Sequence, residues 1–411
     1  ATDMAALKYW VWLATLPGLG TRTRLQLLEH FDSPEDIYYA DEGELLLTPD
    51  ITKAQAALLA DKSLERTEQV LADCARDGQF ILTMGDSLYP NRLRTIFDPP
   101  ILLYGKGALP MFDDEVAVTV VGTRSCTPYG VRAASQLGYE LSKQGALLVS
   151  GMAKGIDGEA LKGALRAGGF TAAVLGGGAD VIYPAENRRL YQDIAATGVI
   201  LSEYPPGTVP KADHFPVRNR LLSALSLATV VVEAPEKSGA LITANHALEQ
   251  GRDVFTLPGN VGNPSCAGNI QLLKQGAIVV EEGWDILKEY THLYPELPLR
   301  QSSSAPLTLT AQETQQSLIV AESSAAPEKI DTKAVDKPEI RAYIDVQEIL
   351  PQVSPDEAAV LRLLEDGKQP VDRLIDETQL PAGRILSALT LLEVKGFVKR
   401  LPARYYELAK K

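Results

Sequence analysis

Between residues 116 and 290, short apolar runs alternate with stretches of helical character, and this alternation constrains the fold more than any other feature. The runs are rich in Val, Ile and Leu and are continuous rather than interrupted by polar residues. Continuous runs are typical of strands that are covered on both faces. The sequence therefore predicts an α/β domain with a Rossmann-like, doubly wound parallel sheet. The predicted strands are 116–121, 146–150, 171–175, 199–201, 229–233, 254–257 and 278–281.

The segments between these strands predict helices that end near a glycine. Gly145, Gly168, Gly198 and Gly251 each follow such a segment, at the position where a left-handed glycine commonly ends a helix. The predicted helices are 131–144, 157–167, 185–196, 217–227 and 241–250.

Residues 1–79 predict a separate, small helical domain. The sequence LPGLG at 16–20 predicts a turn, and the next helix is expected from about Thr21 to Phe31 with Thr21 as its N-cap. This pattern is typical of a helix–hairpin–helix (SAM-like) unit, whose glycine turn can present backbone N–H groups to a DNA phosphate. A plain tight turn is the alternative, and the acidity of this region favours it. Two further strands, expected within 80–115, extend the sheet domain to 80–295.

The rest of the chain predicts a linker and a third domain. Residues 296–353 are rich in Ser, Thr, Ala, Gln and Pro without periodicity, which is typical of a flexible linker. Residues 354–411 predict a winged-helix domain, a fold that does not by itself establish DNA binding. Its last helix is mostly apolar apart from Arg384 and Lys395, which favours partner docking or a vestigial role over DNA contact.

The net charge of −13 does not decide whether the chain binds nucleic acid. Residues 1–115 carry a net charge of −9, whereas residues 116–290 carry only −1. Because salt screens charges beyond about 8–10 Å, a local basic site on the sheet domain is compatible with an acidic chain. The three cysteines are far apart, which is typical of a cytosolic protein, and no apolar run approaches the roughly 20 residues of a membrane span. We therefore expect a cytoplasmic protein without a membrane segment.

Two basic, glycine-containing segments follow predicted strands at the end of the sheet where open α/β folds bind ligands. Gly122, Thr123 and Arg124 follow the first strand, and Arg124 can contact a phosphate through two hydrogen bonds. Pairing of Arg124 with a carboxylate is an equal alternative. The segment SGMAKGID places Lys154 at the cleft mouth and Asp157 at a helix start, where capping is its expected role.

Two more glycine-containing segments follow later strands. The run Gly176-Gly177-Gly178 is a weak phosphate signal that serves chain turning equally well. Ser238 and Gly239 begin a helix, whose N-terminus supplies free amides to an anion.

The segment KADHFPVRNR at 211–220 is the most informative. Pro216 is expected in the first helical turn, so the Phe215 ring stands at a helix start. An aromatic ring near Lys211, Arg218 and Arg220 offers a stacking face and phosphate partners, and stacking is worth roughly 1–3 kcal/mol for any base. The alternative is a core Phe215, with the arginines paired to Glu203 or Glu233.

Several catalytic motifs are missing from the sequence. There is no GxxxxGK[ST], GxSxG or HExxH, no evident acid–base pair, and no metal-ligand spacing among the histidines and cysteines. We therefore expect a binding protein with no catalytic residue, no metal and no cofactor.

Nine ordered segments resemble the DprA (Smf) family of DNA-processing proteins. They are VGTRSCTPYG, SGMAKGIDGEAL, AVLGGGADVIYPAEN, SEYPPG, HFPVRNRLLSALS, VVVEA, SGALITA, GRDVFTLPGN and the GA at 276–277. The resemblance is tight over about 100–290 and looser toward both termini. Thr123, Lys154 and Gly158 stand where the family commonly has Ser, Arg and Ala, changes that keep polarity, charge or small size.

The resemblance implies a single-stranded DNA-binding protein of bacterial natural transformation. Such a protein shields incoming strands, helps to load the RecA recombinase and acts as a homodimer through its Rossmann-like domain. The Gly-Thr-Arg turn and the block from Lys211 to Asn219 would form the DNA pocket, with Lys154 as a looser candidate. The candidate DNA-binding residues are Gly122, Thr123, Arg124, Lys154, Lys211, Phe215, Arg218, Asn219, Arg220, Ser238 and Gly239.

Two enzyme classes are the competing interpretations. A phosphoribohydrolase acting on nucleotide derivatives would use a related sheet, but its PGGxGT-type loop is replaced here by SGALIT at 238–243. A dinucleotide-dependent oxidoreductase is disfavoured because no GxGxxG follows the first strand.

Overall fold

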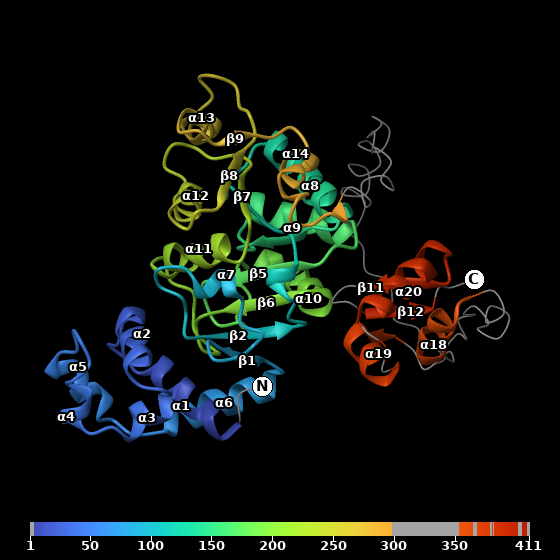
Figure 1. Cartoon of the computed structure of the whole chain (residues 1–411). Helices are drawn as coiled ribbons and strands as arrows, with labels where there is room; N and C mark the ends of the chain where they lie inside the picture. Colours follow the sequence, from blue (N-terminus) through green and yellow to red (C-terminus); the bar gives the residue numbers. More distant parts are fainter. Residues whose placement is uncertain are drawn as a thin grey trace, which may run out of the picture. The chain divides into compact units, whose positions relative to one another are not determined.

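The computed structural model of the chain (Figure 1) describes residues 4–297, 353–364, 368–378, 380, 382–401 and 405–408. It divides into two compact units, residues 1–301 and 302–411, each of which is described here by itself. The predicted linker, residues 296–353, lies almost entirely outside the described residues.

The first unit begins with a small helical region that has a core of its own. Trp12, Leu27 and Leu59 are fully buried there, together with Ile101 from the segment before the second strand. Gly18 adopts a φ of +81°, a left-handed conformation that suits glycine and allows the turn predicted at 16–20. The expected N-cap at Thr21 is wrong, because the helix begins at Thr21 and Gly20 is the N-cap. The helices are α1 (Met4–Thr15), α2 (Thr21–His30), α3 (Pro34–Tyr39), α4 (Glu42–Leu45), α5 (Lys53–Leu59) and α6 (Glu65–Asp77).

A nine-stranded sheet forms the centre of the first unit, in the order β1-β2-β6-β5-β4-β3-β7-β8-β9. Across the sheet, the seven neighbouring strands β6-β5-β4-β3-β7-β8-β9 all run parallel to one another. This confirms the predicted Rossmann-like sheet. The two strands expected within residues 80–115 are β1 and β2, and they extend the sheet beyond β6 in the antiparallel direction. The strands are β1 (Phe80–Thr83), β2 (Leu102–Gly107), β3 (Ala117–Val121), β4 (Leu147–Ser150), β5 (Thr171–Leu175), β6 (Val199–Ser202), β7 (Ala228–Val231), β8 (Asp253–Thr256) and β9 (Ile278–Val279).

Helices cover both faces of this sheet and enclose two apolar cores. The strands are buried on both sides: in β3, Val118 and Val120 face one core, and Ala117 and Val121 face the other. The first core is covered by α8 (Pro128–Lys143), α9 (Ile156–Arg166), α10 (Arg188–Thr197) and α14 (Gly283–Leu287). The second is covered by α7 (Asn91–Arg94), α11 (His214–Ala224), α12 (Gly239–Glu249) and α13 (Ala267–Lys274). Short 3-10 turns complete the unit: η1 (Phe112–Asp114), η2 (Ala185–Asn187), η3 (Pro264–Cys266) and η4 (Lys288–Tyr290).

Three of the four predicted helix-ending glycines are left-handed. Gly145, Gly168 and Gly251 have φ values of +89°, +71° and +67°. Gly198 differs, with a φ of −143°, because the chain enters β6 directly after α10. A Cβ there would lie 2.2 Å from the carbonyl oxygen of Thr171, so close strand packing explains this glycine.

The second unit has the helices and strands of a winged-helix domain, as predicted. Its described helices enclose a core that includes Leu361, Leu374 and Leu389. The elements are α18 (Pro355–Leu364), β10 (Gln369–Pro370), α19 (Val371–Thr378), α20 (Ala382–Val394), β11 (Val398–Leu401) and β12 (Tyr405–Leu408), with strand order β10-β12-β11. Over the described ranges of the whole chain, no helix has the length and apolar character needed to cross a membrane.

Glycines allow α8 and α9 to pack backbone against backbone. A Cβ on Gly138 would lie 2.1 Å from the carbonyl oxygen of Ala160, and one on Gly163 would lie 2.0 Å from that of Ser135. Neither position can accept a methyl group without separating the two helices, because backbone atoms cannot rotate away.

We predict that Gly138→Ala lowers the free energy of unfolding by about 1–3 kcal/mol, the usual cost of overpacking a core. Urea denaturation monitored by circular dichroism measures this change. Gln136→Ala is the matched control, because Gln136 is exposed on the same helix and surface changes usually cost less than about 0.5 kcal/mol. Equal stability of the two variants would contradict the close packing of α8 on α9.

Candidate functional site

A cleft lies at the carboxyl end of the parallel sheet, where β3 is flanked by β4 and β7. Strand order reverses at this point, which is where open α/β sheets bind their ligands. The cleft consists of two adjoining cavities of about 460 Å³ and 590 Å³. Both are lined by Arg124, Ala153, Tyr183, Pro210, Phe215 and Arg218.

The Phe215 ring lies at the start of α11 and lines both cavities. The ring is half-buried, so the alternative of a core phenylalanine does not describe it. The guanidinium carbons of Arg124 and Arg218 lie 4.8 Å and 5.8 Å from its centroid, within the range of cation–π attraction. Tyr183, which is 46% exposed, places its ring centroid 5.7 Å from that of Phe215. The cleft thus offers two neighbouring aromatic rings, one of them covered by an exposed arginine.

Arg218 forms the buried floor beneath this ring. Its Nη1 donates to the carbonyl oxygens of Gly151 and Val174, and its Nε donates to the side-chain oxygen of Asn219 at 3.2 Å. Burial lowers the pKa of Arg218 to about 10, and the negative charge of Asp157 opposes this shift. The guanidinium therefore stays charged at neutral pH and gives the cleft a permanent positive floor.

Asp157, the second residue of α9, is a buried carboxyl that acts electrostatically on Arg218. Its Oδ2 accepts a hydrogen bond from the backbone N–H of Gly151 at 3.2 Å. Burial raises the pKa of this carboxyl, and the charge of Arg218 together with backbone hydrogen bonds opposes the rise. Asp157 thus holds the loop after β4. The capping role that the sequence predicts is wrong, because Gly155 is the N-cap of α9 and no side chain caps this helix.

The Gly-Thr-Arg turn after β3 is locked to its neighbours through the backbone. The N–H of Thr123 donates to the carbonyl of Glu233 at 2.7 Å, and its own carbonyl accepts from the N–H of Ile156 at 3.2 Å. A Cβ on Gly122 would lie 2.5 Å from the Ile156 side chain, so the turn needs glycine for this approach. The Arg124 side chain, by contrast, is exposed.

The N-terminus of α12 lines the 590 Å³ cavity from the side of β7. Ser238 caps this helix by accepting from the N–H of Ala240 at 3.3 Å. Gly239 is exposed, and a Cβ there would meet no other atom within 4 Å. Asn219 is buried and connects the two helices, because its amide donates to the carbonyl of Gly239 at 3.4 Å.

The three lysines of the cleft region occupy different places. Lys154 lines the smaller cavity, and Lys237 lines the larger one. Lys211 is exposed beside the cleft rather than in its lining, although its neighbours Pro210 and Ala212 line the larger cavity. The cationic side chains therefore lie along the cleft instead of meeting at one point.

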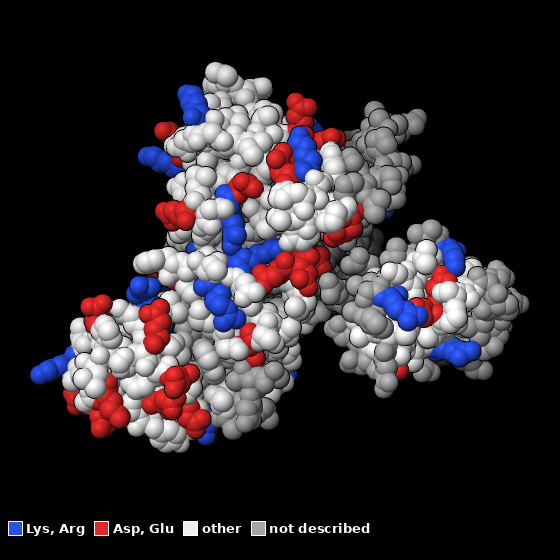
Figure 2. Space-filling view, in the orientation of Figure 1, with Lys and Arg blue, Asp and Glu red and all other residues white. Residues whose placement is uncertain are grey.

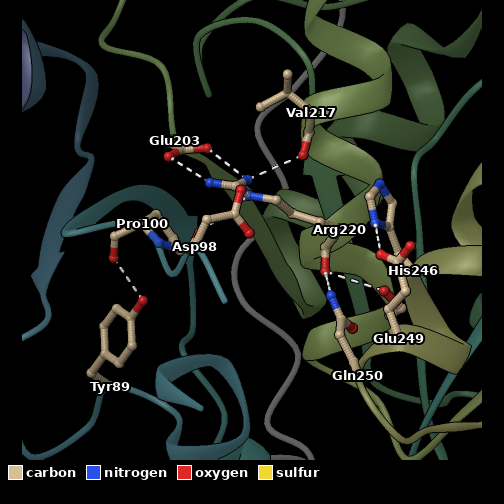
Figure 3. Close-up of polar contacts among 10 residues, drawn as sticks. Tyr89, Asp98, Pro100, Glu203, Val217, Arg220, His246, Glu249 and Gln250 are labelled. Carbon is tan, nitrogen blue, oxygen red and sulfur yellow. Dashed lines mark hydrogen bonds and ion pairs between the residues drawn. The ribbon is translucent and has the colours of Figure 1, made fainter. Parts of the chain in front are cut away.

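Arg220 does not line the cleft, so the prediction that it contacts DNA is wrong. The side chain is only 3% exposed and forms ion pairs at 2.9 Å with Asp98 and Glu203 (Figure 3). Helical periodicity explains the difference, because Arg220 lies two residues after Arg218 and projects from another side of α11. The alternative of a salt bridge to Glu203 is the one that the structure bears out.

Sequence reasoning did not select Tyr183, Lys237 or Asp157 as site residues. The segment after the glycine run contains Tyr183, but nothing in the sequence shows that it crosses toward Phe215. Lys237 could have been found from its position just before the helix that begins at Gly239. Within the described parts of the chain, no group of three or more His, Cys, Asp and Glu side chains could hold a metal ion.

These features define a Rossmann-like α/β protein with an arginine-floored, aromatic cleft at the carboxyl end of its sheet. Residues 80–291 match the family model of DNA recombination-mediator protein A. Residues 347–404 match the DprA winged helix domain, and residues 13–62 match a SAM-like helix-hairpin-helix tandem. The chain belongs to the DprA (Smf) family.

Individual relatives agree with this assignment. Protein Smf of Synechocystis is 32% identical over 403 residues, which cover 97% of this chain and 98% of that protein. DNA processing protein DprA of Bacillus subtilis is 41% identical over 221 residues, covering 54% of this chain and 74% of that protein. The X-ray structure of DprA from Streptococcus pneumoniae superposes with a TM-score of 0.61 at 33% identity, covering 69% of this chain and 97% of that one.

We predict that Asp157→Ala lowers the free energy of unfolding by about 1–3 kcal/mol, because it leaves the buried N–H of Gly151 without its acceptor and removes the negative charge that acts on Arg218. The double variant Asp157→Ala/Arg218→Met should recover part of this loss, since it removes both charges. Urea denaturation of the wild type, the two single variants and the double variant measures the coupling. If the losses of stability in the two single variants simply add up in the double variant, Asp157 and Arg218 are not electrostatically coupled.

Proposed function

We propose that the cleft binds single-stranded DNA. The observation that carries the proposal is the Phe215 ring, which lies in the cleft with the exposed Arg124 guanidinium 4.8 Å from its centroid. Bases stack on aromatic rings and on guanidinium planes, and this stacking does not depend on sequence. In a duplex the bases are already stacked on one another, so an aromatic ring inside a cleft favours an unpaired strand.

The surroundings of the ring fit the phosphates of such a strand. Arg124 and Lys154 line the smaller cavity, while Lys237 and the α12 N-terminus line the larger one. Arginine, lysine and free helix amides are the groups that contact phosphate oxygens. Because these groups lie in both cavities, they suit several consecutive phosphates better than one compact nucleotide. We propose that the remaining candidate residues contact the strand or lie beside it. These are Gly122, Thr123, Lys211, Phe215, Ser238 and Gly239. The buried Arg218 and Asn219 support the cleft from inside the protein.

Family membership supports a proposal for the wider biological role. We propose that this protein protects incoming DNA, loads RecA and acts as a cytoplasmic homodimer without enzymatic activity. We also propose the division into domains at 1–79, 80–295, 296–353 and 354–411. Family membership and the resemblance of the sequence blocks support these proposals.

The winged-helix unit has little free positive charge on its third helix. Arg384 forms an ion pair with Asp356 at 2.7 Å, and Lys395 forms one with Glu357 at 2.7 Å. Both partners belong to α18 of the same unit. These ion pairs favour partner docking over DNA contact for this domain, so we assign DNA binding to the sheet.

We predict that Arg124→Ala and Lys211→Glu each weaken the affinity for an oligo-dT at least about tenfold, because each removes a phosphate contact worth about 1.4 kcal/mol or more. Fluorescence anisotropy of a labelled oligonucleotide measures the dissociation constant. Lys143→Glu is the matched control: it makes the same charge change on an exposed residue at the end of α8, on the amino side of the sheet. Unchanged affinity in both cleft variants, or an equal loss in the control, would refute the assignment.

We further predict that affinity falls steeply with salt. Three or four phosphate contacts give a slope of log K against log salt of about −2 to −3, and Arg124→Ala should reduce this slope by about 0.7. Titrations at several salt concentrations measure both values. A flat salt dependence, accompanied by hydrolysis of a nucleotide derivative, would support the phosphoribohydrolase alternative instead.

A further inference from the structure

Phe97 is a large apolar side chain on the surface outside the cleft. It lies between α7 and β2, and 77% of its surface is exposed. The guanidinium carbon of Arg22, an exposed residue of α2, lies 5.0 Å from the centroid of its ring. The pair therefore joins the N-terminal helices to the sheet.

This pair repeats the arrangement found in the cleft. Arg124 covers Phe215 at 4.8 Å, and Arg22 covers Phe97 at 5.0 Å. In both pairs the arginine is exposed, so its N–H groups remain available while it contacts the ring. An arginine next to an aromatic ring supplies a phosphate partner and a stacking surface together.

The loop that carries Phe97 is fixed to the helix that carries Phe215. The next residue, Asp98, accepts from Arg220 Nε through its carboxylate at 2.9 Å and through its carbonyl at 3.2 Å (Figure 3). Arg220 follows Phe215 by five residues on α11, a rise of about 7.5 Å along the helix. The two rings are therefore held on one rigid frame, and Arg220 neutralises the carboxylate beside Phe97.

The helix that carries Arg22 is fixed to the end of α1. Arg24 donates to the carbonyl oxygens of Leu13 and Leu16, which fixes α2 to the end of α1. Burial lowers the pKa of Arg24, and the charge of Glu203 opposes that shift. The N-terminal helices in turn share an apolar core with Ile101, which lies in the segment between Phe97 and β2.

We propose that Phe97 and Arg22 form a second stacking contact for single-stranded DNA, which a strand reaches after leaving the cleft. The inference rests on the proposed function of the cleft. In Figure 2, acidic side chains gather over the N-terminal helices, and basic side chains lie where these helices meet the sheet. The contact is accordingly confined to this border, and the strand does not cross the acidic surface of the helical region.

The test measures binding of the full chain to two lengths of oligo-dT. The short oligonucleotide, of about 5 nucleotides, is chosen to occupy the cleft alone. The long one, of about 20 nucleotides, exceeds a typical single-site footprint. We expect Phe97→Ala and Arg22→Ala each to weaken binding of the long oligonucleotide about fivefold or more, the lower limit for one stacked base. Binding of the short one should not change. Phe97→Trp should retain the affinity, and its added fluorescence should be quenched by the long oligonucleotide only.

Leu47→Ala is the matched control, because Leu47 is 73% exposed on the same N-terminal region and has no place in the proposed contact. Unchanged binding of the long oligonucleotide by Phe97→Ala, while Arg124→Ala weakens it, would overturn the second contact and leave the cleft assignment standing. An equal loss for both lengths would also overturn it, since Phe97 would then act through the cleft. Failure of the wild-type chain to bind either oligonucleotide would refute the proposed function itself.

Discussion

The cleft depends on one buried cation. Arg218 is only 4% exposed, and it remains charged at neutral pH although burial lowers its pKa to about 10. A charge in such a place must be compensated. The carbonyls of Gly151 and Val174 accept hydrogen bonds from its guanidinium, and the charge of Asp157 acts on it, so the loop after β4 and the end of β5 converge on Arg218. The need of Arg218 for hydrogen-bond acceptors and negative charge thus determines which backbone groups lie beneath Phe215.

Three arginines of the sheet domain differ in burial, and each has a different role. Arg124 is exposed and lies over the Phe215 ring, where it is available to a ligand. Arg218 is buried and supports the same ring from within the protein. Arg220 is buried in ion pairs with Asp98 and Glu203 and fixes the surrounding loops to α11. The surroundings of a guanidinium group therefore decide its role: Arg124 faces water and is free to meet a ligand, Arg218 supports the cleft, and Arg220 stabilises the fold through carboxylates.

Much of the fold could be predicted from the sequence, because continuous apolar runs and helix-ending glycines report burial and chain reversal directly. The doubly wound sheet and two further strands that extend it are predictable on that basis, but the antiparallel direction of β1 and β2 is not. The site was predicted less completely. Residue type identified Phe215 and Arg124, but the orientation of Arg220 depends on its place around α11 and on Asp98, which is 122 residues away in the sequence. Tyr183 was missed for the same reason, since its approach to Phe215 is a tertiary contact that no local pattern encodes.

Photochemical cross-linking can show directly whether single-stranded DNA binds in the cleft at the carboxyl end of the sheet. An oligo-dT in which single thymidines are replaced by 5-iodo-deoxyuridine would be bound to the full chain, irradiated, and mapped by mass spectrometry. We expect cross-links to Phe215 and Tyr183, because these are the two neighbouring aromatic rings of the cleft. Cross-links confined to residues 354–411, with none at the carboxyl end of the sheet, would contradict this expectation.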